Sequence, residues 1–231
     1  MLRPSIHVSA VLLTWLTGLS NPVIAQTPPS TAEIAAYRGL HAAAAAGDVA
    51  ALQAALRDRR DVTTRDGHGR TALLIAAHGG HADVVRVLAK AGADMTAMDS
   101  QRYDIITIAA VRNDAKLVEL AVSLGADPKA ITSPYDGTAL IAAAHLGHYE
   151  VVQALIAAKA PLDHVNNLGW TAVIEAVILG DGGPRHQATL KALVDAGANT
   201  RLADRGGQTP LDHATRRGYS AMITILAAAK K

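Results

Sequence analysis

A short motif recurs along this chain at a nearly constant interval. Segment 66–73 (DGHGRTAL) returns as 166–173 (NNLGWTAV) and as 204–211 (DRGGQTPL). The equivalent position in successive units is occupied by Thr71, Asp104, Thr138, Thr171 and Thr209, which are spaced 33, 34, 33 and 38 residues apart. A period in this range is typical of solenoids, in which each unit packs only against its neighbours. The repeat predicts about six stacked units, in the frames 33–65, 66–98, 99–132, 133–165, 166–203 and 204–231.

Each frame has the marks of two helices. A threonine hydroxyl before the first helix can accept from an unpaired amide of the first turn. Spacings of three and four, as in Leu73, Ala76 and Ala77, gather apolar groups on one helical face. We expect a left-handed residue to end the first helix, at Gly47, Gly80, Asn113, Gly147, Gly180 and Gly218. We expect the second helices to end at Gly92, Gly125 and Gly197. Lys159 breaks this series. Because a left-handed Lys is unfavourable by about 1 kcal/mol, we expect a reshaped turn there.

The amino-acid composition and the absence of known motifs exclude several kinds of functional site. Phe is absent and aromatics make up 3% of the chain, so the core is built from small aliphatic side chains. The lack of cysteine excludes disulfides and thiolate sites. A formal charge of +2 gives no excess that would attract nucleic acid. The sequence has no phosphate-binding, dinucleotide-binding, zinc-protease or serine-hydrolase motif. We therefore expect no catalysis and no cofactor.

The repeated signatures Gly-x-Thr-Ala/Pro-Leu, paired Ala, Gly-His and Gly-Ala-Asp resemble those of the ankyrin-repeat family. Segment 71–94 is close to the family pattern, whereas the third unit has Asp104-Ile105-Ile106 in place of Thr-Pro-Leu. The resemblance covers nearly all of residues 33–231. It implies an all-α solenoid of helix-turn-helix units with short β-hairpin fingers, which binds another protein through its concave groove and finger tips.

The resemblance also implies where recognition takes place, namely the fingers and the exposed side of the first helices. The predicted partner-binding residues are His68, Arg70, His78, Gln101, Tyr103, Arg112, Tyr135, His145, Trp170 and Arg216. Tyr103 and Trp170 hold the same finger position, and Tyr, Trp and Arg are frequent anchors of interfaces. Their rings either contact a partner or cover adjacent fingers. A basic, aromatic groove would suit an acidic partner segment.

Ten histidines raise an alternative function, the binding of a metal ion or small molecule through a His-rich face. His78 with His81, and His145 with His148, have the spacing of one helical turn. The competing interpretation is that His81, His148 and His186 stabilise turns by hydrogen bonds, as the resemblance implies. An insertion at 181–185 lengthens the turn of the fifth unit, either as a tolerated loop or as a rim contact for a partner.

The first 25 residues have the layout of a secretory signal peptide. A start with one Arg and no acid precedes an apolar run at 8–19 and a break at 20–22, so we expect cleavage after Ala25. A membrane-spanning helix would need about 20 apolar residues. We expect a linker at 26–32, a bacterial periplasmic or secreted location, and no membrane contact after cleavage. The apolar segment 223–229 suggests weak homo-association through the C-terminal helix.

Overall fold

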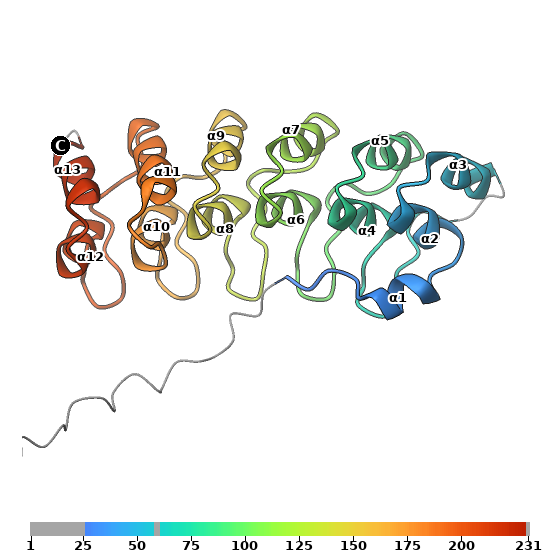
Figure 1. Ribbon diagram of the computed structural model, residues 1–231, viewed down its shortest axis with the longest axis horizontal. Helices are drawn as coiled ribbons and strands as arrows, with labels where there is room; N and C mark the ends of the chain where they lie inside the picture. The colour runs from blue at the N-terminus through green and yellow to red at the C-terminus, as the bar shows by residue number, and fades with distance from the viewer. Residues whose placement is uncertain (1–25, 58–60, 230–231) are drawn as a thin grey trace, which may run out of the picture.

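The computed structural model describes residues 26–57 and 61–229, which form one row of stacked helices (Figure 1). The predicted signal peptide, 1–25, lies outside these residues. The short α1 (Thr31–Ala36) comes first, and six helix pairs follow it. The pairs are α2 (Gly39–Ala46) with α3 (Val49–Arg57), α4 (Ala72–Gly79) with α5 (Ala82–Lys90), α6 (Ile105–Val111) with α7 (Ala115–Ser123), α8 (Ala139–His145) with α9 (Tyr149–Ala157), α10 (Ala172–Ile178) with α11 (Pro184–Asp195), and α12 (Pro210–Arg217) with α13 (Ser220–Ala228). The predicted all-α solenoid is confirmed.

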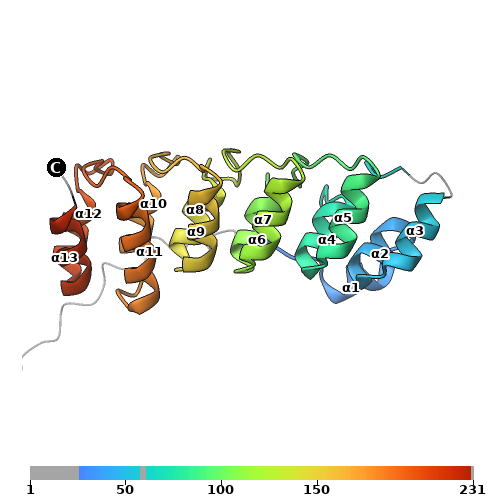
Figure 2. The same ribbon diagram turned by 90° about the horizontal axis from the view of Figure 1, so that it is seen from above.

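The helix pairs form two layers. The first helices of the pairs lie in one row and the second helices in the other (Figure 1). Seen from above, the loops that join one pair to the next run along one side of the stack (Figure 2). We call the side formed by the first helices and these finger loops the inner face, and the side formed by the second helices the outer face.

The first helices begin where the repeat pattern predicts. Thr71 Oγ1 accepts from Leu74 N at 3.4 Å, and Asp104 Oδ1 accepts from Thr107 N at 2.7 Å. The same bond begins α8, α10 and α12. The predicted left-handed turn follows these helices at Gly47, Gly80, Asn113, Gly147 and Gly218. Asn113 has φ 59°, so the third repeat keeps the backbone geometry without glycine.

The turn after α9 differs from the prediction. Lys159 has φ 61°, and Ala160 N donates to Leu155 O at 2.9 Å, as Ala93 N does to Leu88 O at 3.0 Å in the second repeat. The expectation of a reshaped turn is therefore wrong. The left-handed lysine is unfavourable by about 1 kcal/mol, but the turn keeps its backbone bonds and buries Ala160.

The turn of the fifth repeat is also rebuilt. Gly182, with φ 70°, is left-handed in place of Gly180, so the expectation for Gly180 is wrong. Part of the 181–185 insertion extends α11 to 12 residues, against nine in α9. Pro184 occupies the first turn of α11, where its missing amide proton is not needed. A Cβ at Gly182 would lie 2.6 Å from the Tyr219 ring, so this turn packs against the last repeat.

The finger loops are hydrogen-bonded turns. In the described residues they contain isolated antiparallel bridges, Arg65 with Thr71 and Thr132 with Gly137, instead of the hairpin strands that the resemblance implied. The apolar core runs through the whole stack and consists mainly of Ala, Leu, Ile and Val. Small side chains let the helices approach closely, because little volume separates their backbones.

Each junction between repeats has one side chain that reaches back to a backbone carbonyl of the preceding first helix or its end. His81 Nε2 lies 3.2 Å from Ala45 O, and His148 Nδ1 lies 2.8 Å from Ala110 O. The other junctions use Arg112 to His78 O, His186 Nε2 to His145 O at 3.0 Å, and Tyr219 Oη to Gly180 O at 3.2 Å. This confirms the interpretation that His81, His148 and His186 stabilise turns by hydrogen bonds.

Candidate functional site

Each finger is organised by a side chain at its first position. Asp66 Oδ1 accepts from His68 N and from Arg70 N, both at 2.9 Å. Equivalent pairs of bonds are made by Asp99, Asn166 and Asp204, and by the Ser133 hydroxyl in the fourth repeat. A short acceptor that bonds amides two and four residues on fixes a tight turn. The repeat-spaced acids and amides at 66, 99, 166 and 204 were the sequence signal for this feature.

Neighbouring fingers are tied together. Ser100 N donates to His68 O, Ser133 N to Arg102 O, and Asn167 N to Tyr135 O, each at 2.9 Å. Arg205 Nη2 donates to Asn167 O at 2.6 Å. Because each finger is bonded internally and to the next, the finger side chains stand on a connected backbone rather than on independent loops.

Arg70 does not face solvent, contrary to its prediction as an exposed finger residue. It is 1% exposed, and Nε donates to Asp66 Oδ2 at 2.7 Å. Its other nitrogens bond Glu33, Tyr37 Oη at 3.1 Å and Thr27 O at 3.3 Å. Burial alone would raise the pKa of Asp66, but hydrogen bonds from Tyr37 and Arg70 hold that pKa at about 2. Arg70 therefore acts as a clamp within the fold.

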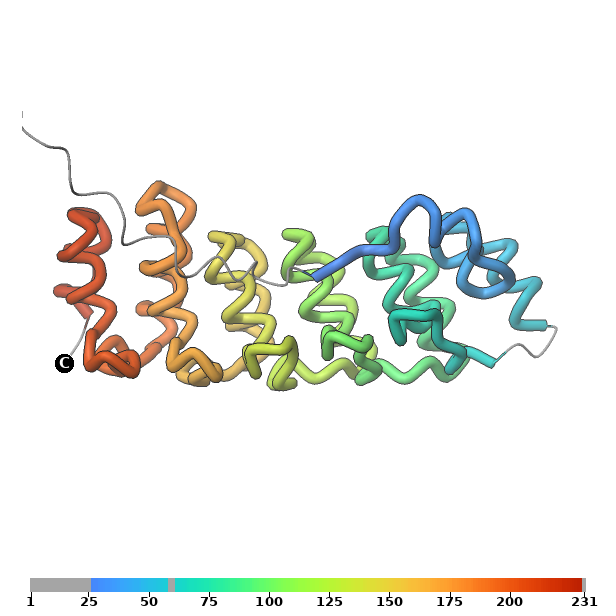
Figure 3. Tube along the Cα trace, turned by 90° about the horizontal axis from the view of Figure 1, so that it is seen from below, coloured from blue at the N-terminus to red at the C-terminus, as the bar shows by residue number. Residues whose placement is uncertain are grey.

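The segment that Arg70 holds is residues 26–36, which we call the N-terminal strap. Figure 3 shows the strap beginning beside the third repeat (green) and crossing the inner face past α4 towards α2. The range 26–32, expected to be a linker, includes the Ser30 cap of α1 and its first two residues. Ser30 and Glu33 form a reciprocal capping box, and these hydrogen bonds, followed by Arg70, lower the pKa of Glu33 to about 2.

His78 lies beneath the strap. It is 7% exposed and shares a small cavity of about 90 Å³ with Pro28, Pro29, Ile34 and Ile75. Burial, followed by the charges of Arg70 and Arg112, lowers the pKa of His78 to about 4. The expectation that His78 is exposed on the first helix is therefore wrong, because a segment outside the repeat pattern covers it.

Tyr103 is buried as well. Its side chain is 6% exposed, and burial beside Asp99 raises the pKa of its hydroxyl to about 12. Trp170, at the same finger position, is half-buried. The interpretation that the ring covers adjacent structure applies to Tyr103, whereas Trp170 keeps part of its ring accessible.

The other predicted residues remain accessible on the inner face. His68, Arg112 and Arg216 are exposed, and Gln101, Tyr135 and His145 are half-buried. Arg216 bonds Gln208 Oε1, and His68 Nε2 lies 3.1 Å from Glu33 Oε1. His145 Nδ1 lies 3.4 Å from Glu175 Oε2.

Glu175 was missed by the sequence reasoning. It is 4% exposed in α10, and Asn166 Nδ2 donates to its Oε1 at 2.9 Å. The signal was a single acid within the apolar run 172–178. With His145 and Asn166 it joins two adjacent repeats on the inner face.

Comparison with protein families decides the class of the chain. The family described as ankyrin repeats (3 copies) matches residues 31–99 and 106–202. The chain belongs to the ankyrin-repeat family. The ankyrin repeat protein YahD of Escherichia coli (strain K12) is 31% identical over 188 residues, which cover 81% of this chain and 93% of YahD.

Solved ankyrin structures agree with this assignment. An ankyrin repeat domain from Acinetobacter baumannii AYE is 42% identical and has a TM-score of 0.78, covering 82% of this chain and 96% of that one. A structure of a predatory endopeptidase from Bdellovibrio bacteriovorus in complex with an immunity protein contains a match at 24% identity and a TM-score of 0.72. That match covers 84% of this chain and 99% of the other, and shows the fold alone.

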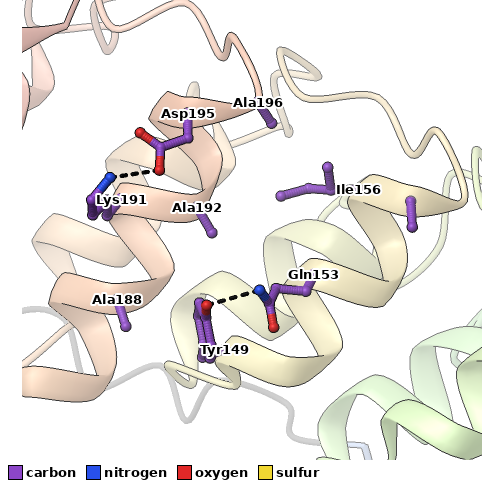
Figure 4. Close-up of a pocket in the computed structure, with 9 residues that line it drawn as sticks. Tyr149, Gln153, Ile156, Ala188, Lys191, Ala192, Asp195 and Ala196 are labelled. Atoms are coloured by element: carbon purple, nitrogen blue, oxygen red, sulfur yellow. Dashed lines mark hydrogen bonds and ion pairs between the residues drawn. The ribbon is translucent and has the colours of Figure 1, made fainter.

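The ankyrin stack also has a groove on its outer face, of about 520 Å³, between α9 and α11 (Figure 4). Its polar groups bond one another: Gln153 Nε2 donates to Tyr149 Oη at 2.8 Å, and Lys191 Nζ to Asp195 Oδ2 at 2.6 Å. The groove is open, and these groups do not converge on a point where a small substrate would be held. The ankyrin fold is typically a non-enzymatic interaction scaffold.

The metal-binding alternative has no geometric support. Within residues 26–57 and 61–229, no group of three or more His, Asp or Glu side chains is placed to hold a metal ion. His78, one of the four histidines named for that alternative, is buried under the strap. None of the described helices has the length and apolar character needed to cross a membrane.

Proposed function

We propose that this protein is a non-catalytic scaffold of the bacterial periplasm that binds a partner protein through its inner face. Ankyrin repeats generally mediate protein–protein interaction. The structural match within the complex of an endopeptidase with an immunity protein is consistent with a protein partner. The layout of residues 1–25 supports export to the periplasm.

One observation carries the proposal, namely a rigid row of fingers with accessible large side chains. Leu168 at a finger tip is 40% exposed. The rings of Tyr135 and Trp170, on the same row of fingers, are half-buried. The backbone beneath them is held by bonds within and between fingers. Preorganised side chains lose little conformational entropy on binding, which favours affinity.

Site-specific photo-crosslinking in the producing cell tests this proposal. A photoreactive amino acid in place of Leu168 reports on the finger row, and the same amino acid in place of Gln153 reports on the outer face. We expect a discrete protein adduct from position 168 and none from 153. Adducts from 153 alone would move the interface to the outer face, and adducts from neither position would refute a protein-binding role for this row.

Homo-association through α13 remains a prediction. The helix buries Met222 and Leu226 against the stack and leaves Ile223 half-buried. Sedimentation velocity of residues 26–231 over a range of concentrations measures it directly.

A further inference from the structure

The inner face is divided into a covered part and an open part. Over the second repeat, the strap places Pro28, Pro29 and Ile34 against Ile75 and His78. The strap begins beside the third repeat and runs over the second towards the first, and the described part of the chain places no segment over the first helices of the fourth to sixth repeats (Figure 3). His145 is the equivalent of His78 in the fourth repeat. It is half-buried, whereas His78 is 7% exposed.

The open part carries a regular pattern of side chains. The position eight residues after the N-cap of each first helix, just before the inner turn, is occupied in the third to sixth repeats by Arg112, Leu146, Leu179 and Arg217. The leucines are 39% and 40% exposed, and both arginines are exposed. Consecutive first helices pack against each other, so these four positions form a line across the stack. Two aliphatic side chains thus lie between two cations.

Among the described residues, no carboxylate forms an ion pair with either arginine of this line. Arg112 bonds the carbonyl of His78, and Arg217 lies 3.4 Å from the hydroxyl of Tyr219; both partners are neutral. All carboxylates of the finger loops and first helices in these repeats accept a hydrogen bond from a donor of the chain: Asp99, Asp104, Asp127, Asp136, Asp163, Glu175, Asp204 and Asp212. An exposed arginine without an acid is a ready site for a carboxylate from outside.

The strap is an internal precedent for such a contact. Its Glu33 carboxylate binds Arg70 on the inner face, and Ile34 beside it lines the cavity against Ile75. Pro28, Pro29 and the extended Ser30 (ψ 161°) approach the inner face as a non-helical segment. The inner face of this protein therefore already accommodates an extended stretch, 28–30, followed by a helical turn in which an aliphatic side chain lies next to a carboxylate.

We infer that the open inner face of the third to sixth repeats binds an extended segment of a partner protein in which two aliphatic side chains lie between two carboxylates. This inference rests on the proposed function and adds the chemistry of the partner. Packed helices lie about 10 Å apart, so three steps separate Arg112 from Arg217 by about 30 Å. An extended chain in the polyproline-II conformation, like that of Ser30, advances about 3.1 Å per residue with three residues per turn, so side chains three residues apart lie on the same side. The carboxylates are therefore expected about nine residues apart, with the aliphatic residues about three apart between them.

Selection from a displayed library of random 12-residue peptides, on immobilised residues 26–231, tests the inference. We expect enrichment of Asp or Glu at both ends and of Leu, Ile or Val between them. Binding of the selected peptides should weaken about tenfold in Arg217→Gln and in Leu146→Ser/Leu179→Ser, since each variant loses a charge-assisted or apolar contact. It should also weaken with added salt.

Two control variants make the same chemical changes elsewhere. Arg86→Gln removes an exposed arginine on α5 of the outer face, and Ile156→Ser removes a half-buried aliphatic side chain on α9 of the same face. Both should leave binding unchanged. Circular dichroism of each variant confirms that the helices are intact.

The outcomes separate the inference from the proposed function. The inference would be overturned by selected peptides that lack acidic and aliphatic enrichment, or that bind the Arg217 and leucine variants as well as the wild type. If such peptides still competed with a partner crosslinked at position 168, the proposed function would stand. No enrichment at all, together with no crosslinked partner, would overturn both.

Discussion

The buried hydroxyl of Thr189 tests how a polar group inside the stack affects the stability of the fold. Thr189 is 0% exposed in α11, and its Oγ1 has no hydrogen-bond partner among the described residues. The equivalent positions of the second, third, fourth and sixth repeats hold Val84, Leu117, Val151 and Met222, all of them buried. A hydroxyl buried without a partner is unfavourable by about 1–3 kcal/mol. Thr189→Val replaces that hydroxyl with a methyl group and leaves the side chain branched at Cβ, so it creates no large cavity.

We expect Thr189→Val to raise the free energy of unfolding by about 1–2 kcal/mol. This is the lower half of the penalty for a buried hydroxyl, because the interior relaxes around any polar group. For a domain of this size the midpoint of thermal unfolding should rise by about 2–4 °C per kcal/mol. Urea unfolding followed by far-ultraviolet circular dichroism measures the change. An unchanged m value would show that the unfolded ensemble is unaffected.

The matched control is Thr224→Val in α13, where the exposed hydroxyl donates to Ser220 O at 3.0 Å. This change should stay within about 0.5 kcal/mol, as is usual for surface positions. A loss of stability in Thr189→Val larger than in the control would mean that the buried hydroxyl makes a bond in solution, and would refute the reasoning.

Four further outcomes are expected. Lys159→Gly should stabilise the protein by about 1 kcal/mol in urea unfolding, because glycine removes the strain of φ 61°; no gain would mean that the lysine stem compensates. The pKa of Asp66 is lowered from 3.8 to about 2, so its contribution is complete above pH 3.8 and is lost as the pH falls towards 2; the free energy of unfolding should fall over this window, and less steeply in Asp66→Asn. Tyr103→Ala should destabilise the fold by about 3 kcal/mol and Trp170→Ala by clearly less, because the first ring is buried and the second is not; equal losses in thermal unfolding would contradict that difference. The intact mass of the exported protein should correspond to residues 26–231, and a mass that includes 1–25 would contradict cleavage after Ala25.

The repeat fold was predictable because its determinants are local and recur. Thr71 and its equivalents begin helices by bonding amides three residues away, and Gly80 or Asn113 end them through their own backbone conformation. Each of these requirements concerns one turn of chain, so the sequence pattern carries it directly.

The exposure of the site residues was less predictable. Arg70 and His78 lie at positions that face outward in a repeat, but contacts with residues 27–37, more than 30 positions earlier, bury them. These contacts occur once in the chain, so no periodic pattern signals them. The conformation of Lys159 was missed for a different reason, since neighbouring backbone bonds and the burial of Ala160 outweigh a local preference.

The junction bonds have a consequence for how such a protein can diversify. In each of them a side chain of one repeat contacts a main-chain oxygen of the repeat before it, belonging in turn to Ala45, His78, Ala110, His145 and Gly180. A carbonyl is present whatever the residue, so substitution at these acceptor positions leaves the link in place. The inner face can therefore change its chemistry residue by residue during evolution, and even accept the insertion at 181–185, while the connection between successive repeats is retained.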